Sequence, residues 1–318
     1  MPFLIEIKAT GDLINPAYFP FLGFVVGLFS GLLGLGGGWL ITPALNVLGI
    51  PAAYCVGTSL TQMVPTTATG AFKHFRLGNL NLKLASLIAI PLISGVYLGR
   101  STTLKLEEMH LADDIIRIAH IVVASFLGIS MTIDLVKGKE KTATDSRLKK
   151  LMPKFGPIIS VNNQEIYIVQ STSIGCLAGF VSGLMGIGGG LIMIPALIYV
   201  FAIPASQAVA TNLFCVVMGS LNGAILYGVE GKVEYSVAGF ILLGSLIGSY
   251  TGASLSKYAA ERELKFYFVT LLFATVTSLV LKLFGMDIAA SSALFGVALI
   301  LTLTVLYSTN KQRIKSGN

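Results

Sequence analysis

The fold is decided by GLFSGLLGLGGGWLITPAL, residues 27–45, which the chain repeats as GFVSGLMGIGGGLIMIPAL at residues 179–197. Eleven of these 19 positions are identical at an offset of 152. After one inserted residue the match continues at an offset of 153. It then pairs Pro51, Thr58, Leu60, Gly70, Gly95 and Gly99 with Pro204, Thr211, Leu213, Gly223, Gly248 and Gly252. Similarity this long and colinear predicts that the fold is a duplication.

The composition is too apolar for a soluble domain. Of the 318 residues, 54% are hydrophobic and only 12% are charged, about half the share typical of soluble proteins. Apolar stretches of roughly 20 residues recur, which is the length that crosses a bilayer core. We therefore expect an all-α polytopic membrane protein that has the lipid bilayer as its partner. The net charge of +7 does not indicate nucleic-acid binding, because the basic residues gather in loops that orient membrane proteins.

Both repeats open with a glycine-rich stretch, 17–49 and 167–202, that is too long for one crossing. Each is interrupted by three consecutive glycines, and glycine permits broken helices and close backbone approach. We therefore predict that each stretch is a hairpin of two helices or half-helices, entering and leaving the membrane on the same side. Further helices are expected near residues 53–75, 80–101, 112–137, 206–229, 235–258, 263–284 and 288–308.

Lysine and arginine test this arrangement because they concentrate in cytoplasmic loops. With two hairpins, sixteen of the 22 basic residues fall on one side, in residues 73–83, 137–154, 257–265 and 311–315. A single crossing for each stretch would instead place the central linker and the tail on opposite sides. The turn near 73–79 is then inside and its equivalent near 228–232 is outside. The two repeats are therefore predicted to be inverted, as in many secondary transporters.

The predicted division of the chain follows from these segments. It comprises an N-terminal tail (1–16), transmembrane repeat 1 (17–137), a cytoplasmic basic linker (138–165), transmembrane repeat 2 (166–308) and a cytoplasmic tail (309–318). No basic region followed by an apolar one marks a cleaved signal peptide, which favours a bacterial inner membrane. The oligomeric state is unknown from the sequence.

The glycine runs are the first candidate binding site. A helix that begins inside a membrane exposes unpaired N–H groups and a partial positive charge, which together suit an anion. The alternative is that glycines only allow tight helix packing, which we favour for Gly27, Gly31, Gly179 and Gly183. The candidate substrate-binding glycines are Gly36, Gly37, Gly38, Gly188, Gly189 and Gly190.

Polar residues follow both glycine runs at equivalent positions. Thr58, Ser59 and Gln62 in the first half, and Thr211 and Asn212 in the second, lie within otherwise apolar helices. Hydroxyl and amide groups can replace water around an oxyanion such as a sulfonate or a carboxylate. The alternative is ordinary hydrogen bonding between membrane helices. Placement after both glycine runs favours a binding role.

Acidic residues lie away from this site. All fifteen are in loops, in tails or near helix ends, and Asp134 is the nearest to a helix interior. Cation transporters and proton pumps usually bury an acidic residue, so we expect an anionic or neutral substrate. Proton coupling would then use a histidine or a protonated substrate. His120 is one third along its helix and can titrate, although a structural role is favoured for it. The three cysteines lack CxxC spacing, so neither a metal nor a cofactor is predicted.

At these residues the chain resembles the TauE/SafE family of sulfite exporter-like membrane permeases. The resemblance rests on both glycine-rich repeats together with GTSL (57–60), HFRLGN (74–79) and ATNL (210–213). It covers roughly residues 17–308 and implies export or uptake of small sulfur-containing or organic anions, such as sulfite or sulfonates. ATNL stands where the first half has GTSL, so the two half-sites are chemically unlike.

The leading hypothesis is a secondary transporter of a small anion, with alternating access between inverted repeats and protons as a candidate coupling ion. A passive anion channel is the alternative, and flux that ignores every counter-ion gradient would support it. A membrane-embedded enzyme would need clustered His, Asp or Glu within the helices, so no catalytic residue is expected. A structural scaffold would have a dry, fully packed midplane between the glycine runs.

Overall fold

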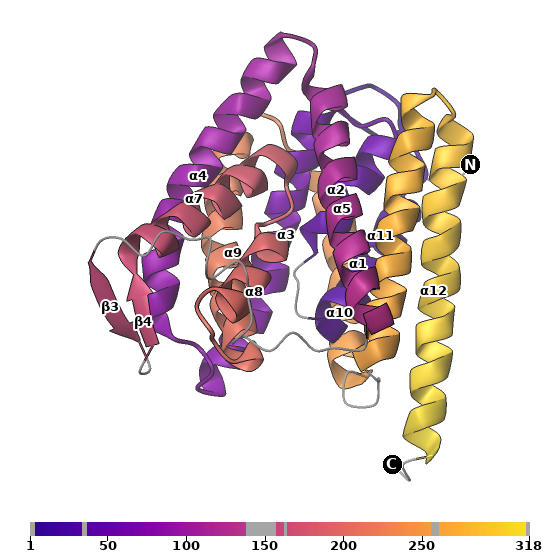
Figure 1. Cartoon of the computed structure of the whole chain (residues 1–318). Coiled ribbons are helices and arrows are strands. Elements are labelled where there is room, and N and C mark those ends of the chain that lie inside the picture. The colour runs from indigo at the N-terminus through magenta and orange to yellow at the C-terminus, as the bar shows by residue number, and fades with distance from the viewer. Residues whose placement is uncertain (1–3, 34–36, 138–156, 162–163, 256–260, 316–318) are drawn as a thin grey trace.

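Each glycine-rich stretch forms two helices that are separated at the glycine run (Figure 1). The computed structural model describes residues 4–33, 37–137, 157–161, 164–255 and 261–315. In it, α1 spans Tyr18–Leu33 and α2 spans Gly38–Val47. The equivalent helices of the second half are α7 (Ile168–Met185) and α8 (Gly190–Tyr199). The structure therefore interrupts both stretches at the three consecutive glycines, as predicted.

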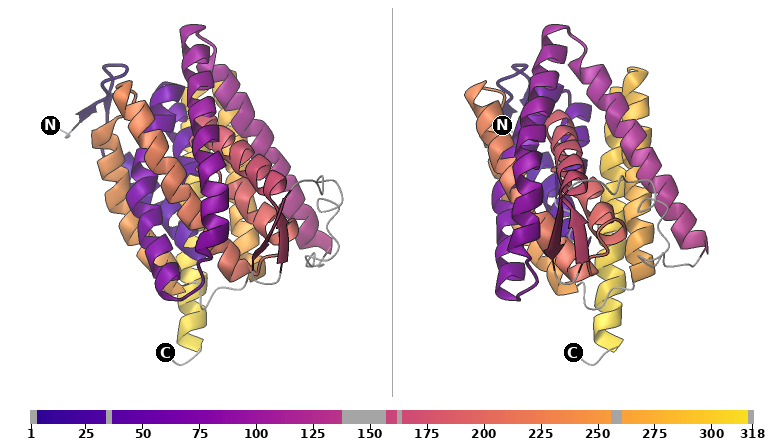
Figure 2. Two further views of the ribbon diagram at one scale, coloured as in Figure 1. Left: turned by 90° about the vertical axis from the view of Figure 1, so that its left-hand side faces the viewer. Right: turned by 60° about the vertical axis from the view of Figure 1, so that its left-hand side comes forward.

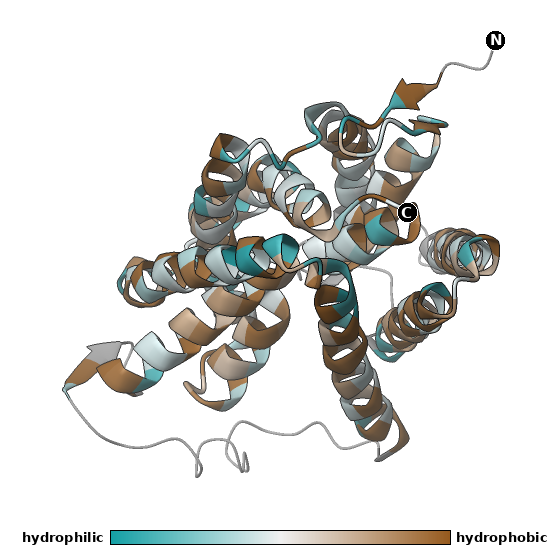
Figure 3. Cartoon of the chain, turned by 90° about the horizontal axis from the view of Figure 1, so that it is seen from above, coloured by the Kyte–Doolittle hydropathy of each residue, from teal (hydrophilic) through white to brown (hydrophobic). Residues whose placement is uncertain are grey.

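The other helices complete an all-α bundle: α3 (Ala52–Arg76), α4 (Leu82–Glu108), α5 (Ala112–Lys137), α9 (Ala205–Val229), α10 (Tyr235–Leu255), α11 (Glu261–Leu283) and α12 (Asp287–Lys315). Among the described residues, seven helices are long and apolar enough to cross a membrane, namely α4, α5, α7, α9, α10, α11 and α12. Large apolar side chains such as Ile90, Phe126 and Ile288 are exposed, and apolar residues run along the outer helices in Figure 3. Lipid would cover these faces, so the chain is a polytopic membrane protein.

Two short hairpins and two helix ends differ from the prediction. Strand β1 (Ile5–Glu6) pairs antiparallel with β2 (Leu13–Ile14), and β3 (Ile158–Val161) pairs antiparallel with β4 (Gln164–Tyr167). Strands of two to four residues are too short to show a recognisable alternation in sequence. Helices α4 and α12 run past residues 101 and 308, their predicted ends. Most of the predicted linker, residues 138–156, lies outside the described residues.

The first helix of each half packs against the fourth helix of the other half. A Cβ atom added to Gly27 of α1 would collide with the backbone of Ser245 in α10, and one added to Gly179 of α7 would collide with the backbone of Leu92 in α4. Leu92 and Ser245 are themselves equivalent, at the offset of 153. Small residues that let membrane helices approach closely are a general means of helix association. The packing contact is therefore the same in both halves, with the partners exchanged.

Helices α3 and α9 cross at the centre of this exchange. A Cβ atom on Gly70 would lie 3.2 Å from Cδ1 of Leu213, and one on Gly223 would collide with Cδ1 of Leu60. These two contacts are also equivalent at the offset of 153. Two helices that meet through reciprocal contacts are related by a local two-fold axis between them.

The equivalent links after α3 and α9 lie at opposite ends of the bundle. The α9–α10 link touches the start of α3, because the backbone nitrogen of Glu234 donates to Oγ1 of Thr58 over 3.0 Å. The α3–α4 link follows Arg76 at the other end of α3, about 27 Å from Thr58 at 1.5 Å per helical residue. Figure 2 likewise places β1 and the end of α12 at opposite ends of the bundle.

Candidate functional site

The two helix breaks are in contact with each other at the centre of the bundle. A Cβ atom on Gly38 would collide with the carbonyl oxygen of Gly186 and with the sulfur of Met63. A Cβ atom on Gly186 would come within 2.6 Å of Oγ1 of Thr42. The glycine run of each half therefore packs directly against the break or the following helix of the other half. Met63 of α3 lies between them.

Backbone geometry explains why the second break needs glycine. Gly186, Gly188 and Gly189 have φ angles of +73°, +70° and +72°, in the left-handed region that glycine enters without steric cost. Gly189 precedes α8 and Gly37 precedes α2, and no side chain caps either helix. The N–H groups of both first turns are therefore left to the backbone or to a ligand. An uncapped helix start carries a partial positive charge that suits an anion.

The predicted hydroxyl pair of the first half is already engaged by protein groups. Thr58 is fully buried, and its Oγ1 accepts a hydrogen bond from the backbone nitrogen of Glu234. Oγ of Ser59 accepts a hydrogen bond of 2.8 Å from Oγ1 of Thr42. Thr58 therefore holds α3 to the start of α10, and Ser59 holds α3 to α2. Gly36, which was predicted with this half-site, lies outside the described residues.

The equivalent pair of the second half is buried without partners. Thr211 and Asn212 are both 0% exposed, and Oγ1 of Thr211 and both polar atoms of Asn212 make no hydrogen bond. The position equivalent to Thr42 is Ile194, which offers Asn212 no polar group. Buried polar groups in folded proteins are nearly always hydrogen-bonded, so unpartnered ones call for an explanation. A bound polar ligand would provide the partners that these atoms lack in the protein.

The side-chain oxygen of Gln62, near the first break, has no hydrogen-bond partner. Its Nε2 donates to Oγ1 of Thr66 over 2.8 Å and to Oγ of Ser245 over 2.7 Å. The hydroxyls of Thr66 and Ser245 lie 3.2 Å apart and each also lies within hydrogen-bonding distance of a backbone carbonyl; with both protons on the carbonyls, the two hydroxyls accept from the amide nitrogen of Gln62. Oε1 of Gln62 has no partner and lies beside Gly37, 4.0 Å from an added Cβ atom there.

A family profile described as sulfite exporter TauE/SafE matches this chain over residues 19–279 and 171–315. The chain belongs to the TauE/SafE family. The probable membrane transporter protein YjnA of Bacillus subtilis is 30% identical over 259 residues, covering 81% of this chain and 97% of the relative. The probable membrane transporter protein YdhB of the same organism is 27% identical, covering 76% and 91%.

An archaeal protein is similar to this TauE/SafE chain as well. A probable membrane transporter protein of Methanocaldococcus jannaschii is 28% identical over 212 residues, covering 65% of this chain and 70% of the relative. No solved structure matches the chain. The family and these relatives together indicate a membrane transporter.

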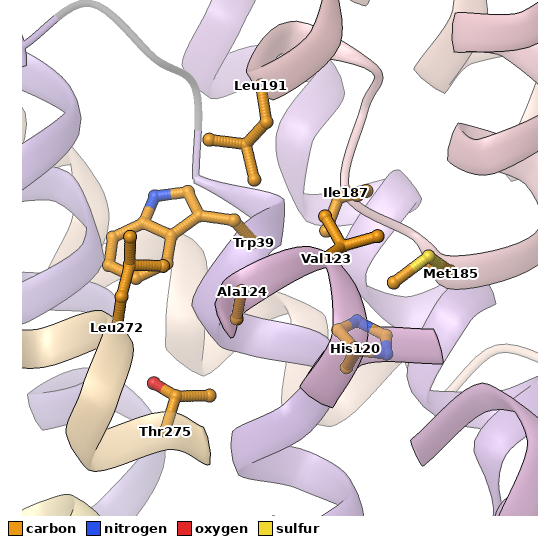
Figure 4. A pocket seen from close by; sticks show the side chains of 9 residues that line it. All are labelled: Trp39, His120, Val123, Ala124, Met185, Ile187, Leu191, Leu272 and Thr275. Carbon is orange, nitrogen blue, oxygen red and sulfur yellow. The ribbon is translucent and has the colours of Figure 1, made fainter. Parts of the chain in front are cut away.

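A small cavity beside the breaks of this TauE/SafE protein was not predicted from the sequence. It has a volume of about 10 Å³, and it lies between α2, α5, α8 and α11 (Figure 4). That is about the room that one water molecule needs. It is lined by Trp39, His120, Val123, Ala124, Met185, Ile187, Leu191, Leu272 and Thr275. The single tryptophan directly after the first glycine run was the available sequence signal.

Charged groups of the TauE/SafE chain that form ion pairs do so near helix ends. Among the described residues, Lys232 pairs with Glu107 over 2.8 Å and Lys282 with Asp287 over 2.7 Å. No cluster of His, Cys, Asp or Glu able to hold a metal occurs in the described part of the chain. Glu234 precedes α10, as predicted for a carboxylate at a helix end, but it is buried, which was not predicted; its Oε1 accepts from the nitrogen of Ala9.

Valine at Thr58 is expected to destabilise the protein. Valine keeps the shape but removes the acceptor of the buried Glu234 N–H, and an orphaned buried donor costs about 1–3 kcal/mol. The midpoint of thermal unfolding of the detergent-purified protein should fall. Thr61 is the matched control, because its hydroxyl bonds only the Gly57 carbonyl of its own helix, and valine there should change little. A stable Thr58→Val protein that has lost transport would instead assign Thr58 to substrate binding.

Proposed function

We propose that this protein is a secondary transporter of a small oxyanion, which binds where the two glycine breaks meet. The observation that carries the proposal is that Thr211 and Asn212 are buried without partners on α9, the helix whose Val216 packs against Gly188 of the second break. Backbone N–H groups, a hydroxyl and an amide are the donors that replace water around an oxyanion. A binding site near the midplane, built from interrupted helices, is typical of secondary transporters.

The family supports a sulfur oxyanion as the substrate, since its name specifies sulfite export. The bare Oε1 of Gln62 beside Gly37 favours an anion that retains an O–H group, because this oxygen can only accept a hydrogen bond. Hydrogen sulfite and organic sulfonates that carry a hydroxyl group meet this requirement, and a sulfonated carboxylic acid meets it when its carboxyl group is protonated. A fully deprotonated anion would place one of its own oxygens, which can only accept a hydrogen bond, against Oε1 of Gln62, which also can only accept.

We infer that access alternates between two inverted repeats. The exchanged packing of α1 on α10 and α7 on α4, and the opposite placement of the equivalent links, support this relation. Because Gly38 packs directly on the backbone of Gly186 and Ile187, an anion can pass between the breaks only if they separate. Separation of packed elements around a central site is the movement of a carrier.

Flux of radiolabelled sulfite and sulfoacetate into proteoliposomes, with and without an imposed pH gradient, tests this function. Saturable flux that responds to the gradient is the expected result. Flux that is neither saturable nor changed by any counter-ion gradient would identify a passive anion channel. Absence of flux for both anions in correctly folded protein would reject this substrate class.

Alanine at Asn212 is expected to weaken transport without weakening the fold. A lost hydrogen bond to a charged ligand costs about 1.5–3 kcal/mol, which corresponds to an increase in KM of roughly tenfold to a hundredfold. Since Asn212 has no protein partner, the thermal stability of the Asn212→Ala protein should equal or exceed that of the wild type.

Asn222→Ala is the matched control, because Asn222 lies on the same helix and bonds the Ile93 carbonyl instead. Its transport should be close to that of the wild type. An Asn212→Ala protein that loses stability and keeps its KM would show that Asn212 serves only helix packing.

A further inference from the structure

Two buried nitrogens without partners line the cavity beside the breaks. Nε1 of Trp39 and Nε2 of His120 make no hydrogen bond, and the two side chains are only 3% and 5% exposed. Figure 4 shows them on the wall of the same cavity, with Met185, Ile187 and Leu191 above His120. Trp39 directly follows the first break, and Met185, Ile187 and Leu191 flank the second. The cavity therefore lies against both breaks.

The hydrogen bonding of His120 determines which of its nitrogens can take a proton. Nδ1 lies 2.8 Å from the backbone carbonyl oxygen of Ile116. A carbonyl oxygen only accepts, so Nδ1 must carry the hydrogen. In the neutral ring, Nε2 then holds a free lone pair. This atom is a base that makes no hydrogen bond of normal geometry, and the backbone carbonyl of Met185 lies near enough to the ring to accept from a protonated Nε2.

The surroundings of Nε2 contain no fixed charge. The helices packed on α5 are α2, α3, α4, α7 and α11. Their ionisable groups include Cys55 of α3, Glu107 of α4 and Lys282 of α11, and none of these lines the cavity. On α5 itself, Arg117 is engaged by Asn46 and Asp114. The cavity lies at the C-terminal end of α7, at Met185, where the helix dipole favours a positive charge.

We propose that His120 is the proton-binding site of this protein, and that protonation of Nε2 is linked to the separation of the two glycine breaks. A proton on Nε2 creates a donor and a charge in a cavity that holds about one water molecule. Opening the breaks would hydrate that charge, and closing them around the neutral ring would remove it from water, which disfavours the charged form. The proton therefore binds preferentially in one of the two states. The coupling part of this inference rests on the proposed transport function, whereas the proton site itself does not.

The chain carries its own reporter for this site, because Trp39 is its only tryptophan and His120 is one of three histidines. An imidazolium quenches indole fluorescence more strongly than a neutral imidazole. In detergent-purified protein excited at a wavelength selective for tryptophan, the Trp39 emission should therefore fall as the pH drops from about 8 to about 3, a range that covers exposed and deeply buried histidines.

Two variants assign the titration. The double variant His74→Gln/His110→Gln leaves His120 as the sole histidine and should keep the full change in emission. His120→Asn keeps an amide N–H for the Ile116 carbonyl and should abolish it. A wild-type emission that is constant over this range, or a titration that is lost in the double variant, would overturn the proton site.

Coupling is tested with radiolabelled sulfite in proteoliposomes. His120→Asn should lose accumulation driven by a pH gradient, at least tenfold, while one-for-one exchange of internal and external sulfite continues, because exchange needs no net proton movement. Accumulation equal to that of the wild type would overturn the coupling. If the wild type moves no sulfite or sulfoacetate while its fluorescence titrates with His120, the transport proposal fails and the proton site stands.

Discussion

Alanine at Gly188 is expected to abolish transport. The residue has a φ angle of +70°, and an added Cβ atom would collide with Cε of Met63 and lie 3.1 Å from Cγ1 of Val216. The left-handed conformation alone costs an alanine about 1–2 kcal/mol. The collision acts on α3 and α9, the two helices that carry the polar residues of the proposed site. Because Cε is the end of a flexible side chain, Met63 can move aside and the protein should still fold; the added methyl group then occupies the proposed binding position, and the initial rate of anion uptake should fall to background.

The variant Gly231→Ala separates the effect of backbone strain from the effect of the collision. Its φ angle is +68°, almost the same, but no atom lies within 4 Å of an added Cβ atom. Gly231→Ala thus carries the backbone strain without the collision, and its uptake should remain within about twofold of the wild type when normalised to folded protein. If Gly188→Ala transports as well as Gly231→Ala, the second break takes no part in binding or in the conformational change.

The sequence could predict the breaks because their cause is local. Three consecutive glycines between apolar segments favour an interrupted helix whatever surrounds them, and the structure places the new helix starts at Gly38 and Gly190. The packing of α1 on α10 and of α7 on α4 is not local. The repeat offset shows that Gly27 and Gly179 are equivalent, but it does not show which distant backbone each one touches.

The candidate site was predicted as two similar halves because Thr58 and Thr211 are the same residue in equivalent positions. Their difference arises from partners elsewhere in the chain. The donor to Thr58 is the backbone of Glu234, 176 positions away, and a backbone group has no sequence signature. Ile194 in place of Thr42 was the visible sign that Asn212 lacks the partner that Ser59 has. Only the structure could show that Thr58 joins α3 to the start of α10 and that Asn212 is buried without a hydrogen-bond partner.

The cavity shows the same limit. Trp39 and His120 are separated by 81 positions, and each by itself is an ordinary buried residue of an apolar helix. Only the packing of α5 beside the two breaks brings their unpartnered nitrogens to one cavity. The sequence identified His120 as able to titrate, but the surroundings that determine its protonation are formed by five separate helices, α2, α5, α7, α8 and α11.

Alanine at Gly179 is expected to unfold much of the protein, by a loss of at least about 2 kcal/mol, in the range of overpacked cores. The added Cβ atom would collide with the carbonyl oxygen of Leu92, and a backbone carbonyl in a helix cannot turn aside. Helices in a membrane gain little from hydrophobic burial and depend on close packing, so moving α7 away from α4 removes most of their contact. The yield of monodisperse protein in detergent and its midpoint of thermal unfolding should both fall sharply.

Gly239 of α10 gives the opposite expectation, because nothing lies within 4 Å of its added Cβ atom. Alanine there should be neutral or stabilise the helix by up to about 1 kcal/mol. Gly27→Ala adds a test of the exchange itself, since it meets Ser245, the equivalent of Leu92. If the two halves are held by the same packing, Gly27→Ala and Gly179→Ala should lower the unfolding midpoint by similar amounts. A large loss in one and none in the other would mean that the two contacts, although equivalent in sequence, do not carry equal shares of the fold.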